Sequence, residues 1–510
     1  MDRIIAYDLG TGGIKASLYD EKGVSLAASF EPYDTHYTGA LLHEQKPEDW
    51  WNGVIVSTKK LLEKSGVKPS DVAGLSISGH SLGVIPVDKD GALLRDKTPI
   101  WSDARAREQA KKFFSGYSFD EWYMKTGNGF PAELYAIFKI MWYKDNEPEV
   151  YAKTYKFLGT KDYINYRLTG VMLTDQSYAS GSGVYDLAGG GYDEAMIAAS
   201  GIDPRKLTDI VPSTHLVGTI TKEAALASGL AAGTRVYCGG VDNSCMALGA
   251  TCYKAGRAYT SLGSSAWIAV STPKPLVDIQ IKPFIFAHVA PGQFASAVSI
   301  FSAGNSFRWI RDNICRDLIL KAKSENTDPY VLMGELAQQS PIGSNKLIFN
   351  PNLAGGAAYE YSPNIRGGYC GLVLGHTTSD MVRAAMEGIA MNLGVVLELL
   401  RSLTDVSDDM IFVGGGSKSE FWRQIFADVY RCNIVKTNID QDAASLGAAA
   451  LAAVGLGLWK DFAPVDEAHA IQDIRKPIEG NVEAYQRYME AFRKAAVHFA
   501  QMGDMLHGMD

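Results

Sequence analysis

The chain begins with a stretch that few folds can accommodate: an apolar run, an aspartate at its end, and then a turn with almost no side chains. In "RIIAYDLGTGGIKASLYDEKG", Asp8 ends the first run, and three glycines within residues 10–13 precede a second run. Apolar residues alternate in both runs, and alternation with a period of two predicts β-strands. The sequence therefore predicts two antiparallel strands joined by a glycine turn, with a carboxylate at the turn.

A glycine turn of this kind can bind an anion through its backbone, because no side chain keeps the N–H groups away from phosphate oxygens. A carboxylate beside the turn would repel phosphate unless a divalent cation lay between them. Asp8 next to Gly10, Thr11 and Gly12 therefore indicates a site for a magnesium nucleotide. The same residues also suit an ordinary β-hairpin turn with Asp8 as a local acceptor, and this segment on its own favours that simpler interpretation.

The order of predicted elements recurs in the second half of the chain. Residues 3–30 predict a three-stranded antiparallel meander, followed by a helix over 47–65 and a buried strand over 72–79. Glycine turns again follow predicted strands in "VYCGGVDNSC", "YTSLGSSAW" and "IFVGGGSKSEF". The strand–turn–strand units at 8–15 and 260–266 lie about 250 residues apart, as a duplicated domain would place them.

The length of the chain supports the same division. A chain of 510 residues exceeds the size of a single hydrophobic core, so two domains or more are expected. We place the boundary near residue 245, which gives an N-terminal domain of residues 1–245 and a C-terminal domain of residues 246–510. The alternation of strands and helices predicts an α/β fold with a cleft between the domains.

Charge, cysteines and hydropathy exclude several other classes. The net charge is −8 and basic residues are interspersed with acidic ones, so no nucleic-acid partner is expected. The six cysteines show no CxxC spacing, which predicts reduced thiols with neither disulfides nor a zinc site. No apolar run reaches the roughly 20 residues that span a bilayer, and the apolar start is too short for a signal peptide. We therefore expect a soluble, cytoplasmic protein without a membrane partner.

Two common nucleotide-binding motifs are missing from the sequence. There is no GxxxxGK[ST], and "GGGSKSEF" lacks both the GxGxxG spacing and a suitable acid about 20 residues further on. P-loop and Rossmann interpretations are therefore disfavoured. The remaining interpretation is a two-domain protein that holds a nucleotide between paired glycine turns.

A series of motifs, in order along the chain, resembles the FGGY family of carbohydrate kinases. The motifs are "DLGTGGIKA", "HEQKPEDWW", "KDYINYRLTG" with "TDQSYAS", "GGVDNSC", "SLGSSAW", "RGGYCGLVLGH" with "AAMEGIAMNL", and "GGGSKSEFWRQIFAD" with "SLGAAALAA". The resemblance runs from about residue 3 to about residue 495. Within the family, the xylulokinase-like pentulose kinases are the nearest branch.

This resemblance implies two actin-like (ribonuclease-H-like) domains with ATP and a small sugar bound in the cleft between them. Asp8 resembles the acid that organises Mg²⁺, and Asp442 falls where the family often has a glutamate. The residues that resemble the nucleotide site comprise a first phosphate turn, a second phosphate turn and an adenosine-side loop: Gly10, Thr11, Gly12; Gly263, Ser264; and Gly415, Gly416, Ser419. The family usually has threonine where this chain has Ser264, so the hydroxyl is kept.

Asp242 in "GGVDNSC" is the residue to which the resemblance assigns catalysis. Phosphoryl transfer requires the sugar hydroxyl to lose its proton, and a carboxylate within hydrogen-bond reach can accept it. The alternative is an aspartate that caps a helix beginning near Ser244, and both roles can hold together. Asn243 follows where the family often has glutamine, and its amide could bond a sugar hydroxyl.

Four further residues resemble the sugar site: Ser81, Leu82, Trp101 and Asp103. Trp101 would form an aromatic wall and Asp103 would supply a carboxylate. Their alternatives are a core tryptophan and an exposed aspartate paired with Arg105. Lys139 and Trp142 match a family signature in "FKIMWYK", although a helical tryptophan is more often a core residue.

Two stretches depart from the family pattern. Leu82 stands where xylulokinase-like sequences have the histidine of "GQMHG", so a changed sugar preference is expected, with His80 either a replacement donor or a structural histidine. Residues 355–358 replace the charged pair of "GERTP", which could change closure of the cleft or a subunit contact. His376 and Glu387 fit the signature that follows, without an assigned role.

The sequence thus predicts an ATP- and Mg²⁺-dependent kinase that phosphorylates a hydroxyl of a small sugar, most simply a ketopentose such as xylulose. Kinases for ribulose, a hexulose, a tetritol or another polyol stay open as alternatives. So does a nucleotide-dependent sugar sensor without phosphoryl transfer, because a fold does not fix a function. A chaperone-like ATPase is disfavoured, since no residues are left for a peptide-binding module. A homodimer is expected by analogy alone.

Overall fold

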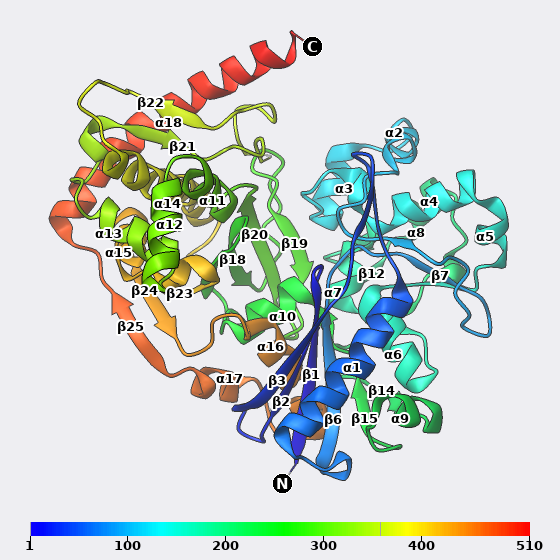
Figure 1. The fold of residues 1–510 in the computed structure, drawn as a ribbon. Helices are drawn as coiled ribbons and strands as arrows, with labels where there is room; N and C mark the ends of the chain where they lie inside the picture. The colour runs from blue at the N-terminus through cyan, green and yellow to red at the C-terminus, as the bar shows by residue number, and fades with distance from the viewer. Residues whose placement is uncertain (1, 358, 510) are drawn as a thin grey trace.

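Two seven-stranded sheets, one in each half of the chain, form the frame of the molecule (Figure 1). The computed structural model describes residues 2–357 and 359–509. In Figure 1 the first half, blue to cyan, lies on the right, and most of the second half, green to red, lies on the left. Helices α10 and α16 lie between the two halves.

The first sheet contains the opening hairpin of the sequence. Its strands are β1 (Arg3–Leu9), β2 (Gly13–Tyr19), β3 (Ser25–Pro32), β6 (Val72–Gly79), β14 (Leu216–Thr219), β15 (Arg235–Tyr237) and β16 (Gly240–Val241). Strands β1, β2 and β3 are antiparallel, while β1, β6 and β15 are parallel, in the order β14-β15-β6-β1-β2-β3 with β16 beside β6. Helix α1 (Pro47–Ser65) packs on this sheet and ends at Gly66, whose φ of 66° is left-handed.

The second sheet repeats this arrangement. Its strands are β17 (Ala258–Leu262), β18 (Ala266–Thr272), β19 (Phe284–Ala287), β20 (Phe294–Ile300), β23 (Asp409–Val413), β24 (Asn433–Thr437) and β25 (Ile471–Arg475). Strands β20, β18 and β17 are antiparallel, and β17, β23 and β24 are parallel. The order β20-β18-β17-β23-β24 therefore corresponds to β3-β2-β1-β6-β15, so the predicted duplication is present in the fold.

Helices from the two halves cross at the centre of the molecule. Helix α10 (Asp242–Gly249) follows the first sheet, and α16 (Ala443–Leu456) follows β24 of the second. A Cβ added to Gly249 would lie 1.7 Å from the carbonyl oxygen of Ala443, and one added to Gly447 would lie 1.9 Å from that of Cys245. The backbones of the two helices are thus in direct contact, which only glycine permits at these positions.

The remaining strands form small separate sheets of two or three strands. The other strands are β4 (His36–Thr38), β5 (Leu42–Gln45), β7 (Ile85–Val87), β8 (Thr98–Pro99), β9 (Lys156–Leu158), β10 (Leu173–Asp175), β11 (Tyr185–Asp186), β12 (Gly191–Tyr192), β13 (Asp209–Val211), β21 (Ile348–Asn350) and β22 (Gly368–Cys370). The other helices are α2 (Arg107–Phe114), α3 (Phe119–Thr126), α4 (Ala136–Asn146), α5 (Pro148–Lys153), α6 (Thr160–Thr169), α7 (Gln176–Ala179), α8 (Glu194–Ser200), α9 (Lys222–Ser228), α11 (Gly304–Asn313), α12 (Arg316–Glu325), α13 (Pro329–Ala337), α14 (Thr378–Leu403), α15 (Glu420–Tyr430), α17 (Ala463–Ala468) and α18 (Glu479–His507).

The last helix, α18, packs against β21, α14 and α15 of the second half. All six cysteines are free thiols, and Cys370 is exposed while the others are buried. Within the described residues, no helix combines the length and the apolar composition needed to cross a membrane.

Candidate active site

Asp8 lies near the carboxyl end of β1, one residue before the strand ends at Leu9. It pairs with Lys15 across the hairpin and with Ser78 on β6, whose hydroxyl donates to Asp8 Oδ1 at 3.1 Å. The side chain is half-buried. Lys15 forms an ion pair with Asp442, the residue preceding α16, so the first turn is tied to the second half of the chain.

Two carbonyl groups of the first glycine turn accept hydrogen bonds from side chains of neighbouring elements. Gln45 Nε2 donates to the Thr11 carbonyl at 2.7 Å, and the Tyr33 hydroxyl donates to the Gly10 carbonyl. The Gly10 N–H closes the turn by donating to Gly13 O at 3.1 Å. Among the described residues, no acceptor takes the N–H groups of Thr11 or Gly12. A turn with fixed carbonyls and free N–H groups suits the binding of an anion.

The second glycine turn, between β17 and β18, is built in the same way. The Ser264 carbonyl accepts from the N–H groups of Ala303 at 3.1 Å and Asn305 at 2.9 Å, at the start of α11. The Gly304 N–H donates to Gly263 O at 3.0 Å, and a Cβ on Gly304 would lie only 2.3 Å from that oxygen. Ser264 itself is exposed, so its hydroxyl is free to face a ligand.

A cavity of about 710 Å³ opens beside the second turn. The structure brings five of the residues predicted for the nucleotide together in its lining: Gly263, Ser264, Gly415, Gly416 and Ser419. Its remaining wall combines apolar rings with polar side chains, namely Phe307, Phe421, Trp422, Asn305, Arg308 and Gln338. A cavity of this size and mixed lining can hold a nucleoside.

Sequence reasoning missed one wall of this cavity. Helix α11 supplies Asn305 and Arg308, α13 supplies Tyr330, and Gln338 follows the end of α13. None of these residues lies in a motif. The available signal was the strong amphipathic pattern of residues 304–313 directly after a strand. That pattern predicts a helix but does not indicate which polar residues face a ligand.

The glycine loop after β23 is fixed by Asp440, whose Oδ1 accepts from the Gly414 N–H at 2.9 Å and from the Ser417 hydroxyl at 3.2 Å. Ser419 is the N-cap of α15 and accepts from the Trp422 N–H at 3.2 Å. Ser419 therefore has a structural role as well as a place in the cavity wall.

Asp242 stands at the start of α10, directly after β16. It is the first helical residue, and Val241 occupies the cap position, so the predicted helix start near Ser244 lies two residues late. Asp242 Oδ1 accepts from the Asn243 N–H at 2.8 Å and from its side-chain amide at 3.2 Å. The carboxylate thus satisfies one N–H at the helix start, as the capping alternative expected, and remains half-buried.

The two aspartates influence each other. Burial raises the pKa of Asp242 to about 7, and the negative charge of Asp8 adds to this rise. Burial likewise raises the pKa of Asp8 to about 6, against the opposing effects of Ser78 and Lys15. A carboxylate with a pKa near neutrality beside a second acid is the environment of a general base.

The same pair of acids fits a divalent cation that arrives with a nucleotide. Within the described residues, no group of three or more acidic, histidine or cysteine side chains could enclose a metal ion. Mg²⁺ is typically bound by one or two carboxylates together with substrate phosphates and water. Asp8, beside the free N–H groups of the first turn, has the chemistry for such a site.

Trp101, predicted for the sugar site, contacts the first glycine turn. Its indole N–H donates to Thr11 Oγ1 at 3.0 Å, and 42% of the residue is exposed. Asp103, by contrast, is fully buried, and its oxygens accept from the Arg105 guanidinium at 2.8 Å and from the His43 N–H at 2.8 Å. Asp103 pairs with Arg105 as the structural alternative expected, but inside the protein rather than at the surface.

Ser81 and Leu82 lie in the turn after β6, and both are buried. Leu82 has a left-handed φ of 59°, and its side chain packs in a hydrophobic core with Val84 and Tyr135. The ring of His80 is buried against Trp50, with ring centroids 5.4 Å apart. The side chains of Leu82 and His80 are therefore both packed inside the protein.

The loop at residues 355–358, which departs from the family pattern, is hydrogen-bonded to nearby residues of the same segment. Glu360 accepts from the Ala357 N–H at 2.6 Å and also from the Asn352 amide. Ala358 lies outside the described residues. Glu387 is buried and pairs with Arg383 at 2.8 Å, which gives it a structural role inside α14.

The fold and the site together define a phosphotransferase of the actin-like class. Its features are two sheets with the same strand order, a glycine turn between the first two strands of each, and a pair of carboxylates near the crossing helices. Models of the FGGY family of carbohydrate kinases match the chain, the N-terminal domain model at residues 3–249 and the C-terminal domain model at residues 258–456. The chain belongs to this family and is a carbohydrate kinase, which confirms the predicted family and fold class.

Two relatives whose names give different substrates are almost equally similar to this chain. The chain is 30% identical to a xylulose kinase of Bacillus subtilis, with 99% of each chain covered. It is 29% identical to a gluconokinase of the same organism, covering 99% of this chain and 98% of the relative. The crystal structure of ligand-bound xylulose kinase from Lactobacillus acidophilus matches with a TM-score of 0.88 at 26% identity, covering 97% of this chain and 98% of that one.

Proposed function

We propose that this kinase transfers the γ-phosphate of ATP to a hydroxyl of a ketopentose such as xylulose. The observation that carries the proposal is Asp242, half-buried beside Asp8, with its pKa raised to about 7 by burial and by the charge of that neighbour. The similarity to proteins named xylulose kinase supports the choice of sugar.

In this mechanism Asp242 accepts the proton of the sugar hydroxyl. The hydroxyl oxygen forms a bond to the γ-phosphorus while the bond from that phosphorus to the bridging oxygen breaks, so ADP leaves with the bridging oxygen. The N–H groups of Thr11 and Gly12 would bind phosphate oxygens, and Asp8 would hold Mg²⁺. Bound Mg²⁺ offsets the negative charge that the phosphates bring next to the two acids.

Gluconate is the second candidate substrate, because a gluconokinase is almost as similar to this chain as a xylulose kinase. The two substrates differ in charge, since gluconate carries a carboxylate. Ribulose, hexuloses and tetritols are kept as further alternatives, together with a sugar sensor that does not transfer phosphate. The predicted cytoplasmic location and homodimer stay predictions.

The proposal is tested by ADP release from magnesium ATP with a panel of ketopentoses, hexuloses, polyols and gluconate. We expect turnover with a ketopentose, and a loss of a hundredfold to ten-thousandfold in Asp242→Asn, the usual contribution of a general base. Asp120→Asn on α3 is the matched control, because Asp120 is exposed and is not among the residues predicted for the site. Turnover only with gluconate would overturn the choice of sugar, and an Asp242→Asn variant as fast as wild type would overturn the base.

A further inference from the structure

A charged cluster is buried beneath the glycine turn that precedes Asp242. Lys161 Nζ on α6 lies 2.6 Å from Asp162 Oδ1 and 3.0 Å from Asp175 Oδ1, and none of the three side chains is exposed. Burial alone would lower the pKa of Lys161, but the two carboxylates raise it well above its ordinary value. Burying three charged groups is costly and is often no more stabilising than an apolar core, so stability alone does not explain the cluster.

Asp175 links this cluster to the catalytic turn. Its Oδ2 accepts from the Ser177 hydroxyl at 2.5 Å and from the Ser213 hydroxyl at 2.7 Å. Ser177 Oγ in turn accepts from the N–H of Val241 at 2.9 Å. Because the Ser177 proton is directed to Asp175, a lone pair of its oxygen is directed to Val241, the residue before Asp242.

The other end of the same turn is held by α6, the helix that carries Lys161. The Cys238 carbonyl accepts from Asn165 Nδ2 at 2.8 Å and from Lys161 Nζ at 3.3 Å, and both donors belong to α6. Between these two anchors the turn consists of Gly239 and Gly240. Gly239 has a φ of 75°, and a Cβ on it would lie 2.1 Å from Ile77 O. The backbone of this turn is held by the Gly239 N–H, which donates to Ser213 O at 3.0 Å, and by the pairing of β16 with β6. Because the turn has no side chains of its own, Ser177 and α6 supply the side-chain hydrogen bonds at its two ends.

We propose that Asp175 is a positioning residue for the reaction, because through Ser177 it fixes the N–H of Val241 and thereby the place of Asp242. Lys161 supports this role from two sides, as the cationic partner of Asp175 and as a donor to Cys238 O. This inference rests on the proposed function of Asp242 as the base.

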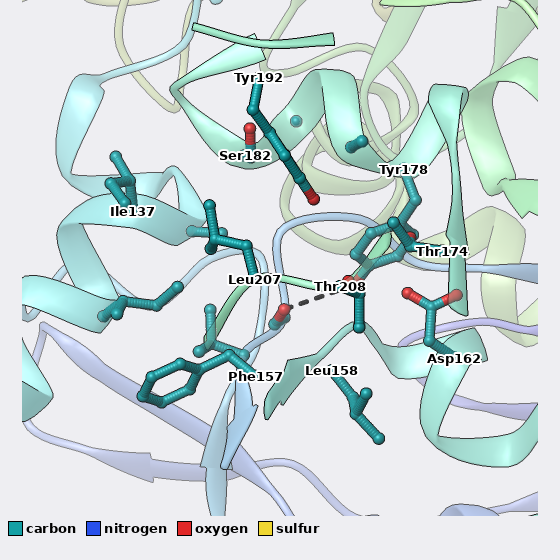
Figure 2. Close-up of a pocket in the computed structure, with 17 residues that line it drawn as sticks. Ile137, Phe157, Leu158, Asp162, Thr174, Tyr178, Ser182, Tyr192, Leu207 and Thr208 are labelled. Atoms are coloured by element: carbon teal, nitrogen blue, oxygen red, sulfur yellow. Dashed lines mark hydrogen bonds between the residues drawn. The ribbon is translucent and has the colours of Figure 1, made fainter. Parts of the chain in front are cut away.

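The fold offers matched variants for a test. Ser177→Ala and Ser213→Ala each remove one hydroxyl donor to the same oxygen of Asp175, but only Ser177 contacts Val241. Asp162→Asn is a second control, because Asp162 pairs with Lys161 but lines a separate small cavity. This cavity has a volume of about 40 Å³, and Thr174 and Tyr178 also line it (Figure 2).

We expect Ser177→Ala to lower kcat by ten- to a hundredfold, on the order of the effect of a misplaced catalytic group, with KM for ATP unchanged. Ser213→Ala should lower the thermal midpoint by about as much as Ser177→Ala does. It should leave kcat within about twofold of wild type. Equal kcat values in the two serine variants, at equal stability, would overturn the inference.

Hydrogen exchange gives a readout that does not depend on activity. Peptides covering residues 238–246 should exchange faster in Ser177→Ala than in Ser213→Ala or Asp162→Asn. If Ser177→Ala does not fold, Ser177→Cys keeps the branching of the side chain and replaces the oxygen with a larger, weakly accepting sulfur. The same loss of kcat is expected. Unchanged exchange in this segment would contradict the proposed anchoring.

Asp242→Asn, measured in parallel, separates the two possible failures. If Asp242→Asn turns over as fast as wild type, the proposed base is wrong and the inference falls with it. If Asp242→Asn is inactive while Ser177→Ala matches Ser213→Ala, the base stands and only the positioning role is wrong.

Discussion

At the residue scale, the raised pKa of Asp242 makes activity depend on pH. Burial and the charge of Asp8 raise this pKa to about 7, and only the ionised carboxylate can accept a proton. We therefore expect kcat/KM for the sugar to fall about tenfold for each pH unit below 7. The measurement is a pH–rate profile at saturating magnesium ATP with a coupling system checked at each pH. A flat profile between pH 5.5 and 8 would contradict the assignment.

The same shift predicts that Asp242 reduces stability. The carboxyl has an ordinary pKa of 3.8 in the unfolded chain and about 7 in the fold, so between these values the folded state binds more protons. Stability from this group is therefore lost as the pH rises from 3.8 to 7. Asp242→Asn should raise the thermal midpoint at pH 8, with a gain that shrinks toward pH 4.

The exposed Asp120→Asn variant should show no such pH-dependent difference. A lower midpoint for Asp242→Asn at pH 8 would show that its bonds to Asn243 outweigh the cost of burial.

At the element scale, helix α4 connects two loops of the predicted sugar side through one buried lysine. Lys139 Nζ donates to Leu82 O at 3.0 Å and to Ile100 O at 2.6 Å, the latter just before Trp101. Lys139→Met keeps the length of the side chain but leaves the Leu82 carbonyl without its donor, at a cost of about 1–3 kcal/mol. The Ile100 carbonyl loses one of its two donors and keeps the Asp103 N–H at 3.1 Å. We expect a KM for the sugar raised about tenfold, or ~1.4 kcal/mol, with KM for ATP nearly unchanged.

Lys144→Met is the control for this prediction, because Lys144 lies on the same helix, also donates to a carbonyl and is exposed. Steady-state kinetics with each substrate varied in turn separates the two KM values. An equal effect of both lysine variants, or a change confined to ATP, would contradict a role for Lys139 in the sugar site.

The elements that the sequence predicted well are those with strong local patterns. Strands β1 and β2 form where apolar runs flank a glycine turn, although both are buried on both faces rather than alternating. Helix α1 has proline at its start and glycine at its end, and the glycine turns recur in both halves. The orientation of Leu82 was not predictable, because a φ of 59° is rare for leucine and depends on the core around it. The cavity wall from α11 and α13 was likewise missed, since it depends on tertiary packing rather than on a motif.

At the scale of the whole molecule, the two halves meet where α10 crosses α16, and Asp242 lies on one of these helices. Gly447→Ala places a Cβ 1.9 Å from the carbonyl oxygen of Cys245, a backbone atom that cannot rotate away. The helices must separate, and the start of α10 moves with them relative to the second phosphate turn. We expect a thermal midpoint lowered by several degrees, as for other overpacked cores, together with a lower kcat.

Gly480→Ala on α18 is the matched control, because a Cβ there meets nothing within 4 Å. A helical glycine replaced by alanine without a clash should leave kcat unchanged and stabilise the fold slightly. ATP and sugar together should also raise the thermal midpoint less in Gly447→Ala than in wild type. The reason is that binding both ligands requires the two halves in their native relative position. A Gly447→Ala enzyme with the stability, kcat and ligand response of wild type would mean that the close crossing does not set the geometry of the cleft.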